Sequence, residues 1–247
     1  MARWLILATA LVMAACTDPP SGSAPADHGT VHRLTVFAAA SLTEPFTAAA
    51  SSVPHVRPTF SFAGSQQLVT QLVQGAPADV VATADEASMQ RLVDARLVGP
   101  PSTLARTTLV IAVASGNPKA VNGLADLGRP GLAVVLADPS VPAGRYARRV
   151  LDRAGVPVRP RSLELDVKAT LAKVESGDAD AALVYATDVR NRTVTAVPFP
   201  EATDPAASVT YRIAPVSASR RRAAADTFVA AATAGPIRDA LVAAGFT

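Results

Sequence analysis

Short apolar runs alternate with amphipathic segments along most of the chain. The runs are rich in Val, Ala, Ile and Leu and lack polar alternation, which is typical of strands buried on both faces. The segments between them carry apolar residues at helical spacing. The predicted strands cover residues 33–40, 56–62, 78–82, 107–113, 133–137, 162–165 and 181–185. The first predicted helix is entered within 41–46, where Pro45 leaves its start open, and continues to about residue 51. The other predicted helices cover 66–74, 86–95, 145–154 and 167–176, with a short one near Leu124. This alternation indicates an α/β protein with mostly parallel sheets flanked by helices.

The pattern restarts after the strand at 107–113, so we expect two similar α/β units. Residues 193–198 and 209–216 are extended again, and helices at 220–234 and 236–244 close the chain. We expect this last part to return to the first unit. The prediction is a two-lobed fold with a ligand cleft between the lobes. Lobe 1 is discontinuous and spans 32–107 plus 208–247, and lobe 2 spans 108–207.

The first 31 residues have a different pattern. Residues 1–16 resemble an export signal, with Arg3 before a 12-residue apolar run that is too short to span a bilayer as a helix. Cys16 follows that run directly, as the lipidated cysteine of a bacterial lipoprotein does, and plain secretion is the alternative. Residues 17–31 are rich in Pro, Ser, Gly and Asp and are expected to be a flexible tether. We therefore expect an exported protein, anchored by lipid on the extracytoplasmic face.

Composition excludes several functions. Cys16 is the only cysteine of the 247 residues, so neither an internal disulfide nor a cysteine metal site can form. The net charge is +3, and the only basic run is 220–222 at the start of a predicted helix. A solvated helix face explains that run better than a nucleic-acid patch, so we expect no nucleic-acid partner.

The chemistry of an enzyme is also missing. His28, His32 and His55 lie away from every strand end that looks functional, so none is expected to act as a general base. The sequence has no nucleophile elbow, P-loop or dinucleotide fingerprint, and its carboxylates do not pair at metal or glycosidase spacing. We therefore expect no catalytic residue, no cofactor and no bound metal cation.

Residues 133–151 contain the most informative corner. The apolar strand 133–137 ends at Asp138-Pro139, and a helix opens at Pro142. Main-chain N–H groups at a helix start are unpaired and carry partial positive charge, so the corner can bind an anion without a cationic side chain. An ordinary strand–helix corner is the alternative.

Two serines occupy equivalent places, each at the end of a strand and the start of a helix. They are Ser41 and Ser65. In parallel sheets, ligands bind beyond the carboxyl ends of the strands, where both serines are expected. Each serine alone is also explained as a helix cap, and Ser41 with Glu44 has capping-box spacing.

Seen together, several motifs resemble those of periplasmic molybdate-binding proteins, the solute-binding components of ABC importers. The resemblance covers residues 34–246. It rests on VFAAASL at 36–42, GS at 64–65, QGAPADV at 74–80, VPAGRYA at 141–147, VESGDAD at 174–180, VYATD at 184–188 and GF at 245–246.

This resemblance implies a ligand and a set of donors. The ligand is molybdate or tungstate, delivered to a membrane permease by what we expect to be a monomer. The donors implied are the hydroxyls of Ser41, Ser65 and Tyr185 and the main-chain N–H groups of Ala143 and Val167. Molybdenum is bound only as its oxyanion. Arg145 is close in sequence but is expected to lie outside the contacts to the ligand.

The sequence departs from the family pattern at three positions. Gln66 replaces a frequent Ser beside Ser65, and Asp166 stands where Asn is usual before Val167. Arg212 follows Tyr211 where Pro is usual, on the hinge side. The alternatives are a binding protein for sulfate, phosphate or another small anion, and an exported α/β hydrolase acting on a phospho- or sulfo-ester.

Overall fold

The predicted alternation of strands and helices is present in the computed structural model, which describes residue 1, residues 30–200 and residues 208–247. The signal segment, Cys16 and the tether up to residue 29 lie outside the described residues. Within the described part, Val31–Thr247 form one compact unit, and no helix there has the length and apolar character needed to cross a membrane.

Three parallel strands and one antiparallel strand form the first half of the sheet. β1 (His32–Ala39) lies between β2 (Val56–Ala63) and β3 (Val80–Thr83), and β9 (Ser208–Pro215) pairs antiparallel with β3. Along β1, side chains alternate between two cores, because successive residues of a strand face opposite ways. Phe37 packs with Leu68 and Met89, whereas Val36 belongs to the core that contains Phe46 and Phe228.

Helices cover both faces of this half-sheet. The Phe37 side is covered by α2 (Ser65–Val73) and α3 (Glu86–Asp94). The Val36 side is covered by α1 (Thr43–Ala48), α6 (Arg222–Ala234) and α7 (Pro236–Ala243). We call these strands and helices the first lobe. The chain end thus returns to its beginning, as the late strand and helices predicted.

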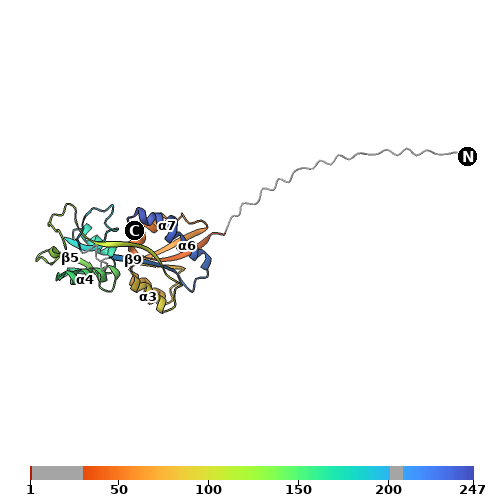
Figure 1. Cartoon of the computed structure of the whole chain (residues 1–247), viewed down its shortest axis with the longest axis horizontal. Coiled ribbons are helices and arrows are strands. Elements are labelled where there is room, and N and C mark those ends of the chain that lie inside the picture. Colours follow the sequence, from red (N-terminus) through yellow and green to blue (C-terminus); the bar gives the residue numbers. More distant parts are fainter. Residues whose placement is uncertain (2–29, 201–207) are drawn as a thin grey trace. The chain divides into compact units, whose positions relative to one another are not determined.

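The second lobe repeats the parallel arrangement. β5 (Val134–Ala137) lies between β6 (Ser162–Glu164) and β7 (Ala181–Tyr185), and both pairings are parallel. The helices here are α4 (Pro142–Ala154), α5 (Val167–Glu175) and the short 3-10 helix η2 (Leu124–Gly128). In Figure 1, β5 and α4 lie together on one side, and α3, α6 and α7 lie on the other.

One long strand joins the two lobes. β4 (Ser102–Ala114) pairs with β9 through Thr108, and from Leu109 onward it pairs with β7. Its end also pairs with β8 (Val194–Val197). The result is a mixed nine-stranded sheet, in the order β2-β1-β3-β9-β4-β7-β5-β6 with β8 beside β4. The two-lobed α/β fold is therefore confirmed, with antiparallel pairings at its centre.

β4 begins earlier than the sequence predicted, and the structure defines the start of α1, which the sequence left open. β4 starts at Ser102, five residues before the apolar run, because pairing with β9 orders a segment whose exposed residues interrupt the pattern. α1 starts at Thr43, after a separate 3-10 turn, η1 (Ala40–Leu42). No side chain caps either η1 or α1, so the capping explanation for Ser41 is wrong.

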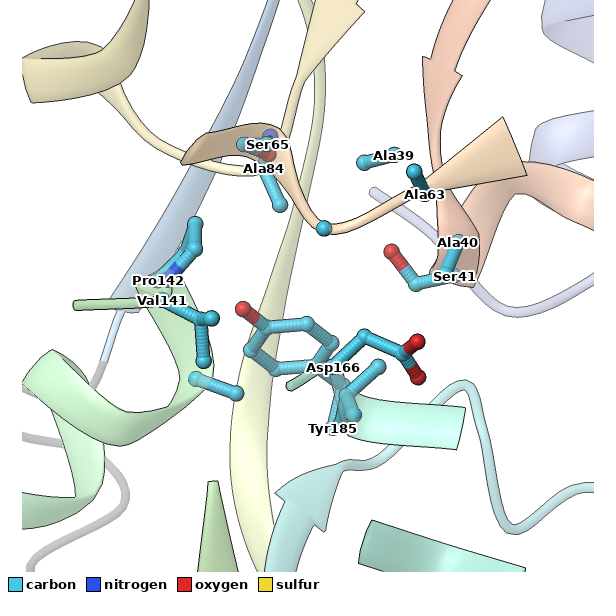
Figure 2. A pocket seen from close by; sticks show the side chains of 13 residues that line it. Ala39, Ala40, Ser41, Ala63, Ser65, Ala84, Val141, Pro142, Asp166 and Tyr185 are labelled. Atoms are coloured by element: carbon cyan, nitrogen blue, oxygen red, sulfur yellow. The ribbon is translucent and has the colours of Figure 1, made fainter. Parts of the chain in front are cut away.

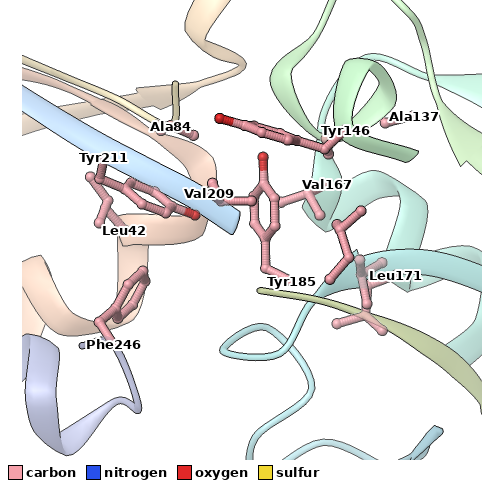
Figure 3. Close-up of a cluster of buried hydrophobic side chains, with 14 of the residues drawn as sticks. Leu42, Ala84, Ala137, Tyr146, Val167, Leu171, Tyr185, Val209, Tyr211 and Phe246 are labelled. Atoms are coloured by element: carbon pink, nitrogen blue, oxygen red, sulfur yellow. The ribbon is translucent and has the colours of Figure 1, made fainter. Parts of the chain in front are cut away.

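Aromatic rings fill the space where β9, β7 and the chain end meet (Figure 3). The ring of Tyr211 on β9 contacts Phe246 edge to face at 5.2 Å between centroids, and Tyr185 on β7 at 6.0 Å. Both tyrosines are almost fully buried. This packing fixes two phenol groups close to the carboxyl ends of the parallel strands.

Candidate functional site

A small pocket, with about 240 Å³ of empty space including its mouth, lies between the two lobes at those strand ends (Figure 2). All five predicted donor residues line it: Ser41, Ser65, Ala143, Val167 and Tyr185. The other lining residues are small or apolar except Asp166. The fold therefore brings together residues that are up to 144 positions apart, from Ser41 to Tyr185.

Ser41 lies in η1, directly after β1, and its side chain is buried. The Ser41 Oγ is 2.8 Å from the Tyr211 hydroxyl, and either group can donate this hydrogen bond. In Figure 2 the Ser41 Oγ points into the pocket. A bond that the Tyr211 hydroxyl donates would leave the Ser41 proton available to a ligand.

Ser65 is the first residue of α2, and Gly64 before it is the helix cap. The Ser65 Oγ accepts a hydrogen bond from the Ala84 main-chain N–H at 3.0 Å. Since an N–H group can only donate, the Ser65 hydroxyl proton must point elsewhere. The Gln67 side chain accepts from the Gly64 N–H at 3.3 Å, which completes the capping without Ser65. The explanation of Ser65 as a side-chain cap is therefore also wrong.

The start of α4 provides uncapped main-chain donors. Val141 precedes the helix without a side-chain cap, and Pro142 has no N–H group. Ala143 therefore carries the first main-chain N–H of the helix, and helix starts leave such groups without an internal partner. Gly144 packs against the end of β5, where an added Cβ would lie 2.0 Å from the Asp138 carbonyl oxygen and 2.5 Å from that of Ala137. This close approach sets the position of the helix start.

The start of α5 has the same form, with a carboxylate beside it. The Asp166 Oδ1 accepts a hydrogen bond from the Ala169 N–H at 2.8 Å, so this side chain caps α5. In Figure 2 the carboxylate is turned away from the Tyr185 hydroxyl. Asp166 accepts from the Ala169 N–H and not from the N–H of Val167, the first residue of the helix. Of the two orientations that the sequence allowed for Asp166, the structure has the capping one.

Tyr185 ends β7 and supplies the remaining hydroxyl (Figure 2). Burial, with the nearby Tyr211 as a smaller contribution, raises the pKa of Tyr185 well above its ordinary value. The phenol therefore stays protonated at neutral pH and can donate a hydrogen bond.

No cationic side chain lines the pocket among the residues that the structure describes. Arg145, expected to stay outside the ligand contacts, is absent from the lining, and its guanidinium forms an ion pair with Asp85. Asp85 is buried and also caps α3 by accepting from the Ser88 N–H at 2.8 Å. Arg212, the third departure, also lies outside the lining and donates to the Thr103 hydroxyl at 2.7 Å.

Several polar contacts join the lobes beside the pocket. The Gln66 Nε2 donates to the Leu165 carbonyl at 3.1 Å. Glu44 on α1 pairs with Lys168 on α5 at 2.6 Å and with Arg192 at 2.7 Å. Partial burial alone would raise the pKa of Glu44, but its hydrogen bond and attraction to Lys168, with help from Arg192, lower it. Gln66 is thus a contact between lobes and is not a lining residue of the pocket.

Sequence reasoning did not identify Tyr211 or Asp188 as part of this region. Asp188 is buried behind the pocket, with the Lys168 Nζ 3.4 Å from its Oδ1. Burial raises its pKa to about 6, although Lys168 acts to lower it. Asp188 belongs to a quoted motif, but nothing in the motif indicates burial. Tyr211 lies in a strand with alternating buried and partly buried residues, and nothing in the local sequence indicates that it contacts Ser41.

Within residues 30–200 and 208–247, no group of three or more His, Cys, Asp or Glu side chains is arranged to hold a metal ion. The candidate donors in the pocket are thus neutral groups at four element starts and one strand end, beside the single carboxylate of Asp166. Such a set can bind an anion by hydrogen bonds alone.

Comparison with known proteins identifies the class. Residues 34–247 match the family model described as bacterial extracellular solute-binding protein. The chain belongs to this family, whose members are extracytoplasmic transport components. This confirms the kind of protein that the sequence motifs indicated.

Individual relatives are more specific. The molybdate-binding protein ModA of Mycobacterium tuberculosis is 44% identical over 261 aligned positions, which cover 99% of this chain and 98% of that protein. The periplasmic molybdate-binding protein of Azotobacter vinelandii has a TM-score of 0.73 at 19% identity, covering 87% of this chain and 98% of that one.

A third relative shows how widely the fold is used. The sulfate-binding protein SubI of Mycobacterium tuberculosis has a TM-score of 0.77 at 19% identity, covering 87% of this chain and 86% of that one. Because a sulfate-binding protein shares the fold this closely, the fold alone does not identify the anion.

Proposed function

We propose that this protein captures molybdate outside the cytoplasm and delivers it to the permease of an ABC importer, and that it also binds tungstate. The main support is the pocket in which Ser41, Ser65 and Tyr185 meet the starts of α4 and α5. The near full-length similarity to a molybdate-binding protein supports the choice of anion.

Neutral donors suit transient capture of a dianion. Hydrogen bonds to a charged group contribute about 1.5–3 kcal/mol each, so a few of them hold the anion firmly. A buried cationic side chain would instead form a strong, desolvated pair with it. The pocket lining contains no such cation within the described parts of the chain, and Arg145 is already paired with Asp85. Binding by neutral donors therefore favours later release to the permease.

The same donors favour molybdate and tungstate over sulfate and phosphate. Donors fixed at helix starts and strand ends adjust little, so the pocket selects by size, and sulfate is the smaller tetrahedron. Phosphate at neutral pH carries a proton that needs an acceptor. The one lining carboxylate, Asp166, caps α5 through its Oδ1, and this contact favours an orientation in which it does not accept that proton.

Titration of the purified protein with molybdate, tungstate, sulfate and phosphate tests this proposal. Calorimetry should show binding of the first two and little of the others. Ligand at 100 times its dissociation constant should stabilise the protein by about 2.7 kcal/mol. Asp166→Asn, which retains a capping side chain, should keep this ranking. A larger thermal shift with phosphate than with molybdate, abolished in Asp166→Asn, would contradict the assignment.

The anchor and the lobe bounds are further parts of this proposal. Cys16 would carry the lipid that holds a monomeric binding protein at the membrane, with residues 17–31 as tether. Cell fractionation should find Cys16→Ser soluble or unprocessed, and a variant that stays fully membrane-bound would contradict the anchor.

Lobe 1 would span 32–107 plus 208–247 and lobe 2 would span 108–207. The change of β4 partner between Thr108 and Leu109 supports this division.

A further inference from the structure

Tyr211 does not line the pocket itself, but its hydroxyl contacts Ser41, a predicted donor that does. It is fully buried on β9, and its oxygen is 2.8 Å from the Ser41 Oγ. Tyr211 itself is not among the residues that line the pocket. A buried hydroxyl without a partner costs about 1–3 kcal/mol, so this contact is expected to persist.

The two pocket serines have comparable surroundings. Each serine oxygen has one hydrogen-bonding neighbour in the fold, the Ala84 N–H for Ser65 and the Tyr211 hydroxyl for Ser41. The Ala84 N–H can only donate, so it directs the Ser65 proton away from itself. The Tyr211 hydroxyl can donate or accept, so the direction of the Ser41 proton depends on Tyr211.

Chemistry favours Tyr211 as the donor when an anion is bound. A phenol is a stronger acid than an aliphatic alcohol, and is therefore the better donor of the two. Burial, with the charge of Asp188 as a smaller contribution, raises the pKa of Tyr211 well above its ordinary value although the hydrogen bond with Ser41 acts to lower it, so the phenol is protonated at neutral pH and has a proton to donate. The ring is held by Phe246 and Tyr185, which limits movement of the hydroxyl.

We propose that Tyr211 is a positioning residue that makes the Ser41 hydroxyl a donor to the bound oxyanion. Tyr211 donates to the Ser41 Oγ, and Ser41 donates in turn to the anion. Each bond in such a chain polarises the next and strengthens it. This inference rests on the proposed function, because it assigns the direction of one hydrogen bond within that site.

A double-mutant cycle tests the inference. Tyr211→Phe keeps the ring and removes the hydroxyl, whereas Ser41→Ala removes the group that Tyr211 positions. We expect Ser41→Ala to weaken molybdate binding by about 10- to 150-fold, as for a lost hydrogen bond to a charge. Tyr211→Phe should weaken it by a smaller factor, about three- to tenfold, because Ser41 remains but loses its orientation.

The combinations separate positioning from a general structural role. Adding Tyr211→Phe to Ser41→Ala should cause no further loss of affinity, because no hydroxyl remains to position. Adding it to Ser65→Ala should multiply the two losses, because these sites act independently. A structural role of Tyr211 would instead multiply the losses in both backgrounds.

Three results would overturn the inference. They are wild-type affinity in Tyr211→Phe, multiplied losses with Ser41→Ala, and an absence of multiplied losses with Ser65→Ala. If Tyr211→Phe folds poorly, the double variant with Ser41→Ala supplies the comparison, because it leaves neither partner buried and unpaired. Its affinity must then equal that of Ser41→Ala, and a lower affinity overturns the inference. Failure of the wild-type protein to bind molybdate would instead reject the proposed function, and this inference with it.

Discussion

The two sides of the pocket present different kinds of candidate donor. From the first lobe come the side-chain hydroxyls of Ser41 and Ser65, each with a polar neighbour behind its oxygen. From the second lobe come the main-chain N–H groups of Ala143 and Val167 at helix starts, together with the Tyr185 hydroxyl. A hydroxyl proton rotates, so a second hydrogen bond to its oxygen can direct it. A main-chain N–H is fixed by its helix, so it depends on where that helix begins.

The largest effect is expected from moving a helix start. In Gly144→Ala the new Cβ would lie 2.0 Å from the Asp138 carbonyl oxygen, so the start of α4 must shift. Loss of the Ala143 hydrogen bond and of the helix-dipole contribution should weaken molybdate binding by about 2–5 kcal/mol in calorimetry. Gly123→Ala is the matched control, because nothing lies within 4 Å of its added Cβ. Equal affinities of the two variants would show that the second lobe does not depend on this position.

A pH-dependent effect on stability is expected from Asp188, which is buried behind the Tyr185 side. Its pKa is raised from 3.8 to about 6 in the folded protein, mainly by burial and against the attraction of Lys168 and Arg192, while Glu44 adds to the rise. The folded state therefore holds this proton more tightly than the unfolded chain. This contribution to stability is present in full below about pH 4 and is lost as pH rises through about 6.

The comparison of wild type with Asp188→Asn isolates this contribution from other carboxylates. The wild-type free energy of unfolding, measured with urea relative to Asp188→Asn, should fall by about 2 kcal/mol between pH 4 and 6, out of about 3 kcal/mol over the whole titration. It should become constant above about pH 7. A difference that does not vary with pH would mean that Asp188 titrates alike in the folded and unfolded states.

Removing one hydroxyl from the first lobe should weaken both ligand binding and stability. Ser65→Ala should weaken molybdate binding by about 1.5–3 kcal/mol and leave the Ala84 N–H unpaired, which costs about 1–3 kcal/mol of stability. Ser52→Ala is the control, because its Oγ donates to Ala49 in the turn after α1, outside the pocket lining. Calorimetry and urea unfolding measure the two effects. If Ser65→Ala loses stability but no affinity, Ser65 holds the fold without contacting the ligand.

A smaller effect is expected where the two sides touch. Gln66→Ser removes the hydrogen bond from the Gln66 Nε2 to the Leu165 carbonyl, which holds the lobes together beside the pocket. Molybdate affinity should fall by about 0.5–1.5 kcal/mol, the net contribution of a neutral hydrogen bond. Gln90→Ser is the control, because the Gln90 side chain bonds Asp94 within α3 alone. If Gln66→Ser binds more tightly than wild type, Gln66 obstructs the pocket instead of closing it.

Most of the fold follows from local patterns in the sequence. Buried strands such as β5 and β7 are continuous apolar runs, and the helix starts of α4 and α5 carry Pro142 and a capping Asp166. These signals lie within a few neighbouring residues, so they need no knowledge of distant contacts. The boundary of β4 is the exception, because pairing with β9 orders its first residues.

The five predicted donors were drawn from a family resemblance, and the structure brings them to one pocket. Position at a strand end made Ser41 and Ser65 candidates from the sequence alone, but a helix cap explained each equally well. Their side chains decide between these explanations, because Ser41 bonds Tyr211 and Ser65 bonds Ala84.

The sequence by itself thus determined the elements, their order and the strand ends at which a ligand would bind. Tertiary structure alone decided which distant residues form hydrogen bonds with the groups at those strand ends. Tyr211 is 170 positions from Ser41, and Gln66 is 99 positions from Leu165. Local propensity contains no information on such pairs, because their partners meet only when the sheet forms and the lobes pack together. The direction of a hydroxyl proton and the contacts that close the pocket are therefore properties of the fold.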